Sequence, residues 1–138
     1  MTTLAEFVTR ALRVPFLELG RDYDGWDCWG LVYVGQRDVF GLDLPRYDDG
    51  YGPDDARRGS PALRDLIAAN MDGWVLVQDP RPGDVVLLRI AGRPVHVGLV
   101  VDARRFLHVE EGVGTFVERM DGAMWARRTE GVYRHVGA

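Results

Sequence analysis

The stretch Gly25-Trp26-Asp27-Cys28-Trp29-Gly30-Leu31-Val32 holds the one cysteine of this 138-residue chain and indicates how the chain folds around it. It begins with loop composition, and the apolar positions that continue to about Phe40 predict a buried helix that ends at Gly41. The thiol therefore lies in the helix's first turn, where the helix dipole favours a thiolate. The backbone N–H of Cys28 is also placed to bind an oxyanion. Gly30 permits close approach, either of substrate or of packing neighbours.

The bulk composition describes one ordinary globular domain, residues 1–138. Apolar residues make up 46% of the chain, charged residues 28%, and the formal net charge is −4. The acidic balance gives no electrostatic basis for general nucleic-acid binding. A lone cysteine excludes an internal disulfide and any structural site built from several thiolates. The sequence has no apolar run of membrane-spanning or signal-peptide length, so we expect synthesis in the cytoplasm without a signal peptide, and no membrane insertion.

Apolar spacing divides the chain into a helical half and a strand half. Helical periodicity covers residues 3–13 and 28–40 and, after a Ser60-Pro61 start signal, about 60–70. Residues 20–27 and 43–59 have loop composition, and the second loop is long enough to be functional. Period-two patterns predict strands at 74–78, 84–90, 95–101, 105–110, 113–118 and 131–136, with a short helical turn at 122–128. Helices followed by a meander of strands predict an α+β domain, with N-terminal helices packed on a C-terminal antiparallel β-sheet.

Two histidines on neighbouring predicted strands can supply the base that a cysteine nucleophile needs. His96 interrupts an apolar strand and His108 lies on the next one. If the two strands turn about residues 101–103, paired positions sum to 204 and the two rings lie directly opposite on one face. We then expect His96 to be the base for Cys28 and His108 to fix its ring and tautomer. His135 does not fit this arrangement.

Each of these residues also has a plainer interpretation. A lone cysteine is often a small buried hydrophobic residue, and a strand histidine is often a packing residue. A Cys-His-His zinc site is another alternative, although the sequence lacks the close ligand pairs typical of zinc sites. Tyr23, Trp26 and Trp29 either pack in the core or form the wall of a cleft beside the thiol. Asp27 is either a solvated loop residue or a carboxylate that recognises a substrate amine and raises the thiol pKa.

Four motifs occur in order along the chain: Asp27-Cys28-Trp29-Gly30-Leu31-Val32, Pro82-Gly83-Asp84-Val85-Val86, His96-Val97-Gly98-Leu99-Val100 and Phe106-Leu107-His108. This ordered set, within a match from about Leu12 to Val136, closely resembles the NlpC family of papain-like cell-wall cysteine peptidases. The resemblance implies a papain-like cysteine peptidase fold. It also implies Cys28 as nucleophile, His96 as base and His108 as the orienting third residue, with no metal or other cofactor.

The resemblance further implies a substrate. Family members typically cleave peptidoglycan stem peptides, often between D-glutamate and the diamino acid. Tyr23 and Asp27 lie near the positions at which members recognise the free amine of the substrate's first residue. Trp29 is a third substrate-binding candidate. The sequence departs from the family's common pattern at this position, where most bacterial members carry a serine that helps to hold this amine in some relatives.

The tryptophan after the cysteine resembles the branch of the family found in phage tail tips and gene transfer agents. We therefore expect a peptidoglycan endopeptidase carried in a phage-like tail, in contact with other tail-tip or hub proteins, that opens the host cell wall locally for DNA entry. The alternative is a structural tail-hub module of the same fold with no required catalysis. In that case the loop 43–59 and exposed aromatic residues would be docking surface.

Overall fold

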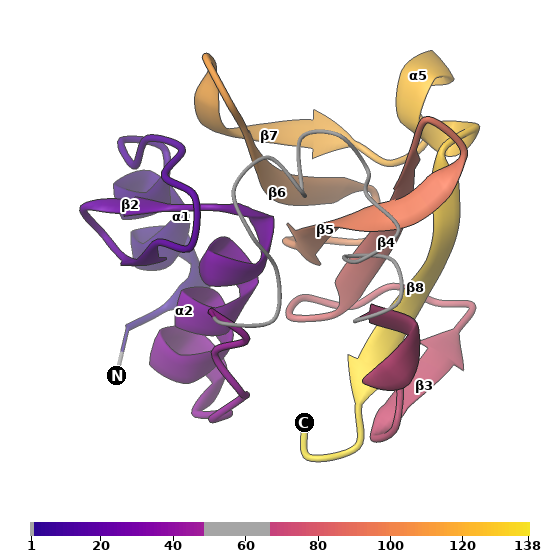
Figure 1. Cartoon of the computed structure of the whole chain (residues 1–138). Helices are drawn as coiled ribbons and strands as arrows, with labels where there is room; N and C mark the ends of the chain where they lie inside the picture. The colour runs from indigo at the N-terminus through magenta and orange to yellow at the C-terminus, as the bar shows by residue number, and fades with distance from the viewer. Residues whose placement is uncertain (1, 49–66) are drawn as a thin grey trace.

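A computed structural model describes residues 2–48 and 67–138, with two helices packed on a six-stranded sheet (Figure 1). The elements in chain order are α1 (Leu4–Ala11), β1 (Arg21–Asp22), β2 (Gly25–Trp26), α2 (Cys28–Phe40), β3 (Trp74–Val77), β4 (Val85–Ile90), β5 (Arg93–Val100), β6 (Arg105–Glu110), β7 (Gly114–Arg119), α5 (Ala123–Ala126) and β8 (Thr129–His135). The predicted α+β class, with helices before strands, is confirmed.

The sheet has the order β3-β8-β4-β5-β6-β7, and every neighbouring pair is antiparallel. Strands β4 to β7 form the predicted meander. The prediction is wrong at the other end, because β8 lies between β3 and β4. A buried carboxylate helps to hold β8 there: Arg134 donates from Nε and Nη2 to the two oxygens of Asp84, at 2.8 Å each. This two-point contact fixes β8 beside the turn that precedes β4.

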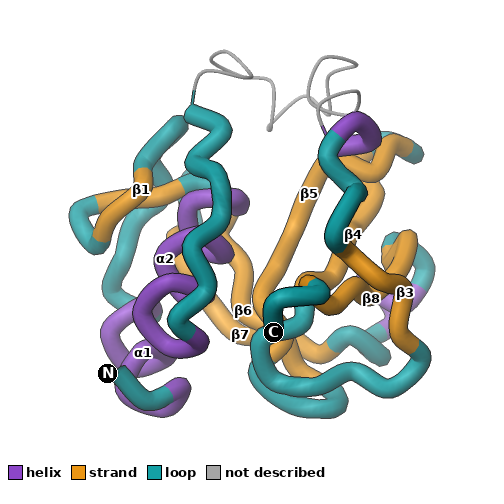
Figure 2. The backbone as a smooth tube through the Cα atoms, turned by 90° about the horizontal axis from the view of Figure 1, so that it is seen from below, coloured by secondary structure: helices purple, strands orange, loops and turns teal. Residues whose placement is uncertain are grey.

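Helix α2 begins and ends where its sequence dictates. The side chain of Asp27 caps the start by accepting from the Gly30 N–H at 2.9 Å, and Gly41 ends the helix with a φ of 67°, which suits glycine. The helix packs on β5 and β6 (Figure 2). At Gly30 a Cβ atom would come within 2.0 Å of the Gly20 carbonyl oxygen, so this glycine serves backbone packing.

The segment before α2 is tied to the sheet through a buried polar chain. The indole N–H of Trp26, which is fully buried, donates to Thr115 Oγ1 on β7 at 2.9 Å. That hydroxyl in turn donates to the carbonyl of Val14 at 2.9 Å. The short hairpin of β1 and β2 lies within residues 20–27, which composition alone had assigned to a loop.

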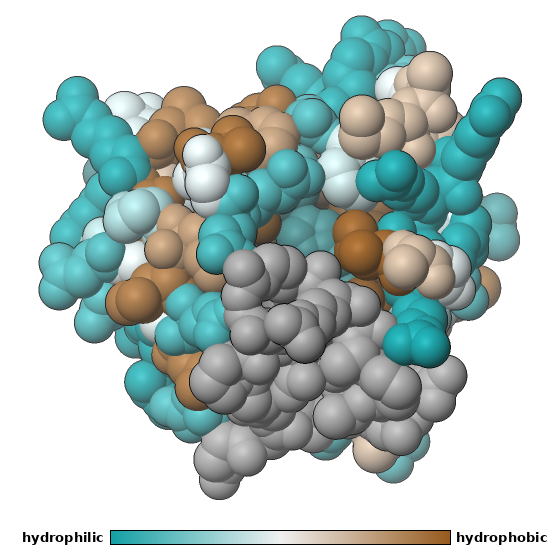
Figure 3. All heavy atoms as spheres, turned by 45° about the horizontal axis from the view of Figure 1, so that its top comes forward, coloured by the Kyte–Doolittle hydropathy of each residue, from teal (hydrophilic) through white to brown (hydrophobic). Residues whose placement is uncertain are grey.

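Part of the sequence prediction falls on residues 49–66, which lie outside the described residues. These include the Ser60-Pro61 helix start and most of the loop 43–59; helix is observed at residues 67–69. On the visible face in Figure 3, hydrophilic side chains alternate with smaller apolar clusters. Within the described ranges, no helix has the length and hydrophobicity needed to cross a bilayer.

Candidate active site

Cys28 is the first residue of α2 and is 6% exposed. Its sulfur is close enough to β5 to take a hydrogen bond from the backbone of Val97, the residue after His96, and it takes another from the backbone of Trp29. Cys28 and His96 also line one cavity, together with residues from β4 and the end of β6. The structure therefore brings the predicted nucleophile and the predicted base to the same space.

The two predicted histidines are in direct contact. His96 Nε2 lies 3.0 Å from His108 Nδ1, both rings are buried, and the ring centroids are 5.2 Å apart. The predicted face is right but the predicted register is wrong. Strands β5 and β6 pair as Leu99↔Leu107 and Val100↔Phe106, so paired positions sum to 206 rather than 204, and the rings meet diagonally.

The register differs because the turn is centred one residue later than expected. Asp102 Oδ1 accepts from the N–H groups of Arg104 and Arg105, at 2.9 and 2.8 Å, and this side-chain turn occupies residues 102–104. Moving the centre by one residue shifts the pairing by two, which leaves both histidines on the same face.

The site opens where two strands separate. The described β5–β6 ladder contains only the two pairs next to the turn, so β5 diverges from β6 before it reaches His96. The thiol approaches from α2, on one face of the sheet. The ring of His96 stacks on Trp125, which belongs to the cluster of buried side chains on the other face. Separation of the strands explains how groups from both faces reach one cavity.

Burial favours the uncharged forms of the Cys28 thiol and of the His96 and His108 imidazoles at neutral pH. It raises the pKa of the Cys28 thiol to about 12, and the charge of Asp27 adds to this rise, although backbone hydrogen bonds act in the opposite direction. Burial lowers the pKa of His96 to about 4. Burial, and then the neighbouring His96, lower the pKa of His108 to about 3. Burial therefore opposes the thiolate that the helix dipole favours.

Asp27 lies beside the thiol, as predicted, but its oxygens have partners within the chain. It is 1% exposed, and its carboxylate accepts from the N–H groups of Gly30 and Leu19 and forms a 2.7 Å ion pair with the equally buried Arg21. The carboxylate beside the thiol therefore caps α2 and neutralises a buried guanidinium. Recognition of a substrate amine by Asp27 stays a prediction.

Tyr23 packs on the helices. Its hydroxyl donates to Asp38 Oδ2 at 2.7 Å, and the guanidinium of Arg10 lies 3.6 Å from its ring centroid. Asp38 comes ten residues after Cys28 in α2, which corresponds to about 15 Å along the helix. The ring therefore joins α1 to α2, and a contact between Tyr23 and substrate stays a prediction.

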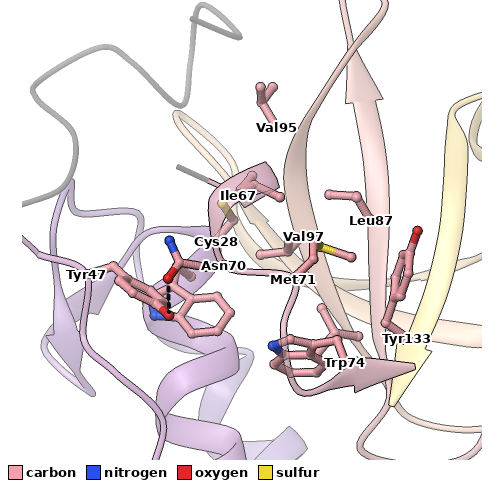
Figure 4. Close-up of a pocket in the computed structure, with 12 residues that line it drawn as sticks. Cys28, Tyr47, Ile67, Asn70, Met71, Trp74, Leu87, Val95, Val97 and Tyr133 are labelled. Atoms are coloured by element: carbon pink, nitrogen blue, oxygen red, sulfur yellow. Dashed lines mark hydrogen bonds between the residues drawn. The ribbon is translucent and has the colours of Figure 1, made fainter. Parts of the chain in front are cut away.

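Trp29 borders a second, apolar pocket. Cys28 lines this pocket too (Figure 4). Its indole N–H donates to the Pro45 carbonyl at 2.9 Å, and its ring lies 5.5 Å from that of Tyr47. Tyr47 has a φ of 50° and donates from its hydroxyl to Asn70 at 3.1 Å. Further lining residues come from the start of β3 and from β4, β5 and β8: Trp74, Leu87, Val95, Val97 and Tyr133. Of the aromatic group singled out in the sequence, Trp26 is core and Trp29 borders a cleft.

Sequence reasoning missed Trp125, which covers the histidine pair. This residue of α5 is 4% exposed; its ring stacks on His96 at 6.1 Å and meets the edge of His108 at 5.0 Å. The prediction of a short helical turn at 122–128 placed a helix here without a role. Because the ring shields the imidazoles from water, it strengthens the hydrogen bond between them. Within the described ranges, no group of three metal-binding side chains is present.

A buried cysteine at a helix start shares a cavity with a histidine from an antiparallel sheet, and a third polar residue contacts that histidine; this is the arrangement of a papain-like cysteine hydrolase site. Comparison with known proteins gives the family. Residues 13–134 match the NlpC/P60 family, and the chain belongs to this family of cysteine peptidases.

Individual relatives agree with this assignment. The chain is 28% identical over 111 residues to an Escherichia coli K12 protein named murein DD-endopeptidase MepS/murein LD-carboxypeptidase; the match covers 79% of the chain and 49% of the relative, so the chain spans about half of that protein. Two solved structures share the fold. An NLP/P60 lipoprotein-like protein of Staphylococcus aureus has a TM-score of 0.65 and 19% identity, over 97% of this chain and 40% of its own. The NlpC/p60 domain of the peptidoglycan hydrolase SagA has a TM-score of 0.61 and 17% identity, over 96% and 99%.

Proposed function

We propose that this protein is a peptidoglycan endopeptidase that cleaves stem peptides through a thioester on Cys28. The observation that carries the proposal is the shared cavity of Cys28 and His96, with His96 held at 3.0 Å by His108. Family membership and the similarity to a murein endopeptidase support peptidoglycan as the substrate.

The neutral resting site sets the order of proton transfers. His96 takes the thiol proton as the sulfur attacks the peptide carbonyl carbon, and the new S–C bond gives a tetrahedral oxyanion beside the start of α2. The C–N bond then breaks, and His96 returns the proton to the leaving amine. In the second step, hydrolysis of the thioester, a water molecule attacks the thioester carbonyl carbon while His96 takes a proton from that water. The S–C bond breaks and Cys28 recovers its proton.

The test is muropeptide release from isolated cell walls by the purified protein. Cys28→Ala should release none above background, and His96→Gln should be slower by about 10²- to 10⁴-fold, the usual contribution of a general base. His135→Gln is the matched control, because this third histidine packs against Trp74 at 5.0 Å and has no part in the mechanism. Equal release by the wild-type and Cys28→Ala proteins would reject the proposal.

We further propose that the enzyme acts in the tail tip of a phage-like particle, next to other tail proteins, and opens the host cell wall for DNA entry. The tryptophan at position 29 supports this setting by its resemblance to that branch of the family. Particles assembled with Cys28→Ala should form normally and fail at entry. Failed assembly would instead support a structural tail-hub module.

A further inference from the structure

The side chain of Glu118 on β7 ends beside His108, on the side of the ring away from His96. Its Oε2 lies 3.4 Å from His108 Nε2. His108 pairs with Phe116 in the β6–β7 ladder, so Glu118, two residues further along β7, projects from the same face and reaches the ring diagonally. With this contact, His96, His108 and Glu118 form a line of three side chains, and His96 at its near end shares a cavity with Cys28.

The two facing atoms are both enclosed. Among the residues that the structure describes, neither His108 Nε2 nor Glu118 Oε2 has a hydrogen-bond partner, although the two atoms approach each other to 3.4 Å. A buried polar atom without a partner costs free energy, so two such atoms that face each other are most stable as a pair. Glu110 also approaches His108, but its Oε1 lies 4.0 Å from Nδ1, the nitrogen already in contact with His96.

We propose that Glu118 is a positioning residue of this site, and that its carboxylate holds the proton of His108 on Nε2. This inference deepens the proposed function and rests on it, because that function makes His96 the base. Glu118 touches neither substrate nor thiol in this arrangement; it acts through His108.

One proton position dictates the next along the line. If His108 carries its proton on Nε2, its Nδ1 is an acceptor, and His96 must donate to it from Nε2. The remaining nitrogen of His96, Nδ1, then presents a lone pair for the thiol proton. When His96 takes up that proton, the carboxylate at the far end of the line stabilises the new positive charge.

A protonated Glu118 would reverse the direction of each hydrogen bond along the line. Its hydroxyl would donate to His108 Nε2, His108 would donate from Nδ1 to His96, and His96 would face the thiol with a proton and could not act as a base. Burial and the neighbouring Glu110 raise the pKa of Glu118 from its ordinary value, which makes the reversed arrangement a definite alternative to test. Only the carboxylate form is compatible with catalysis.

Nitrogen NMR of the substrate-free protein distinguishes the two arrangements. Protonated and bare nitrogens of a neutral imidazole resonate far apart, and with histidine labelled in ¹⁵N and His135→Gln as background, only His96 and His108 remain. We expect both rings to be protonated at Nε2. A proton on Nδ1 of His108 in the wild-type protein would overturn the proposal.

Variants of Glu118 link the tautomer to the rate. Glu118→Leu removes the acceptor and should abolish the fixed Nε2 tautomer of His108; it should lower kcat by about 10- to 100-fold, the usual effect of losing a residue that orients a functional histidine, with KM unchanged. Glu118→Gln keeps an acceptor oxygen and should retain the tautomer, but it lacks the negative charge and should recover only part of the rate. Glu110→Leu is the matched control for the spectrum, and should leave the His108 signals in place.

The outcomes separate this inference from the proposed function. An unchanged His108 spectrum in Glu118→Leu would overturn the role of Glu118, whatever the protein does to peptidoglycan. Should Glu118→Leu fail to fold, the wild-type and Glu118→Gln spectra still decide the matter. A protein that shows the expected tautomers but releases no muropeptides would refute the proposed function and leave the proton arrangement supported.

Discussion

Replacing Asp27 with asparagine should destabilise the fold and activate the thiol at the same time. The side chain caps α2 and neutralises Arg21, and each partner of this ion pair is about 1% exposed. Asparagine caps a helix as well as aspartate, so the cap contributes little to the change. Removing one partner of a buried ion pair costs about 3–5 kcal/mol, because the other charge stays buried without compensation. A loss of this size is a large part of the 5–15 kcal/mol typical of a domain.

The same change should lower the pKa of the Cys28 thiol, since the charge of Asp27 is, after burial, the largest cause of its rise. Two assays on the Asp27→Asn variant measure these effects. Urea unfolding gives the change in the free energy of unfolding, and the rate of Cys28 alkylation at fixed pH reports the change in the thiol pKa. Asp121→Asn is the matched control, because Asp121 pairs with Arg119 on the surface, where an ion pair contributes at most about 1 kcal/mol. A loss below 1 kcal/mol in Asp27→Asn, or slower alkylation, would refute this account of the site.

Three further predictions concern the fold around the site. Burial holds the folded pKa values of His96 and His108 at about 4 and 3, below the unfolded value of about 6.5, so the unfolded chain binds protons first as the pH falls. The free energy of unfolding should be highest above pH 6.5 and should fall toward pH 4 by up to about 1.4 kcal/mol per pH unit for each histidine. Urea unfolding at a series of pH values should show a smaller slope in the His96→Gln, His108→Gln variant. Gly30→Ala, which would stabilise an ordinary helix, should instead lower the thermal midpoint sharply, because its Cβ meets the backbone of Gly20; a raised midpoint would contradict this. Thr115→Val should cost about 2–4 kcal/mol by leaving a buried indole N–H and a buried carbonyl unpaired, whereas Thr115→Ser, which keeps the hydroxyl, should cost less than half as much.

The sequence was most informative where the structure is local. The helix that begins at Cys28, the strand periods and the contact between His96 and His108 on one face depend on neighbours within a few residues or on one hairpin, and all three were predicted. The exact register was missed because it depends on the side-chain turn of Asp102, which a hydrophobic pattern does not reveal.

The parts that the sequence did not give depend on distant contacts. The place of β8 in the sheet depends on Arg134 reaching Asp84, 50 residues away. Trp125 and Glu118 join the site from segments after the second histidine, with no spacing that relates them to it. The sequence holds only weak indications of these two residues. Trp125 is an aromatic residue in a predicted short helical turn, and Glu118 is a carboxylate two positions from the cross-strand partner of His108.

The position of β8 has a consequence for biosynthesis. Until residue 135 has left the ribosome, β4 is the edge of an incomplete sheet, and its run of Val85, Val86, Leu87 and Leu88, buried in the finished protein, is uncovered. A nascent chain that stalls or is cleaved before β8 therefore exposes an unpaired apolar strand edge, which favours chaperone binding or aggregation. The sheet cannot be complete until β8 has been translated.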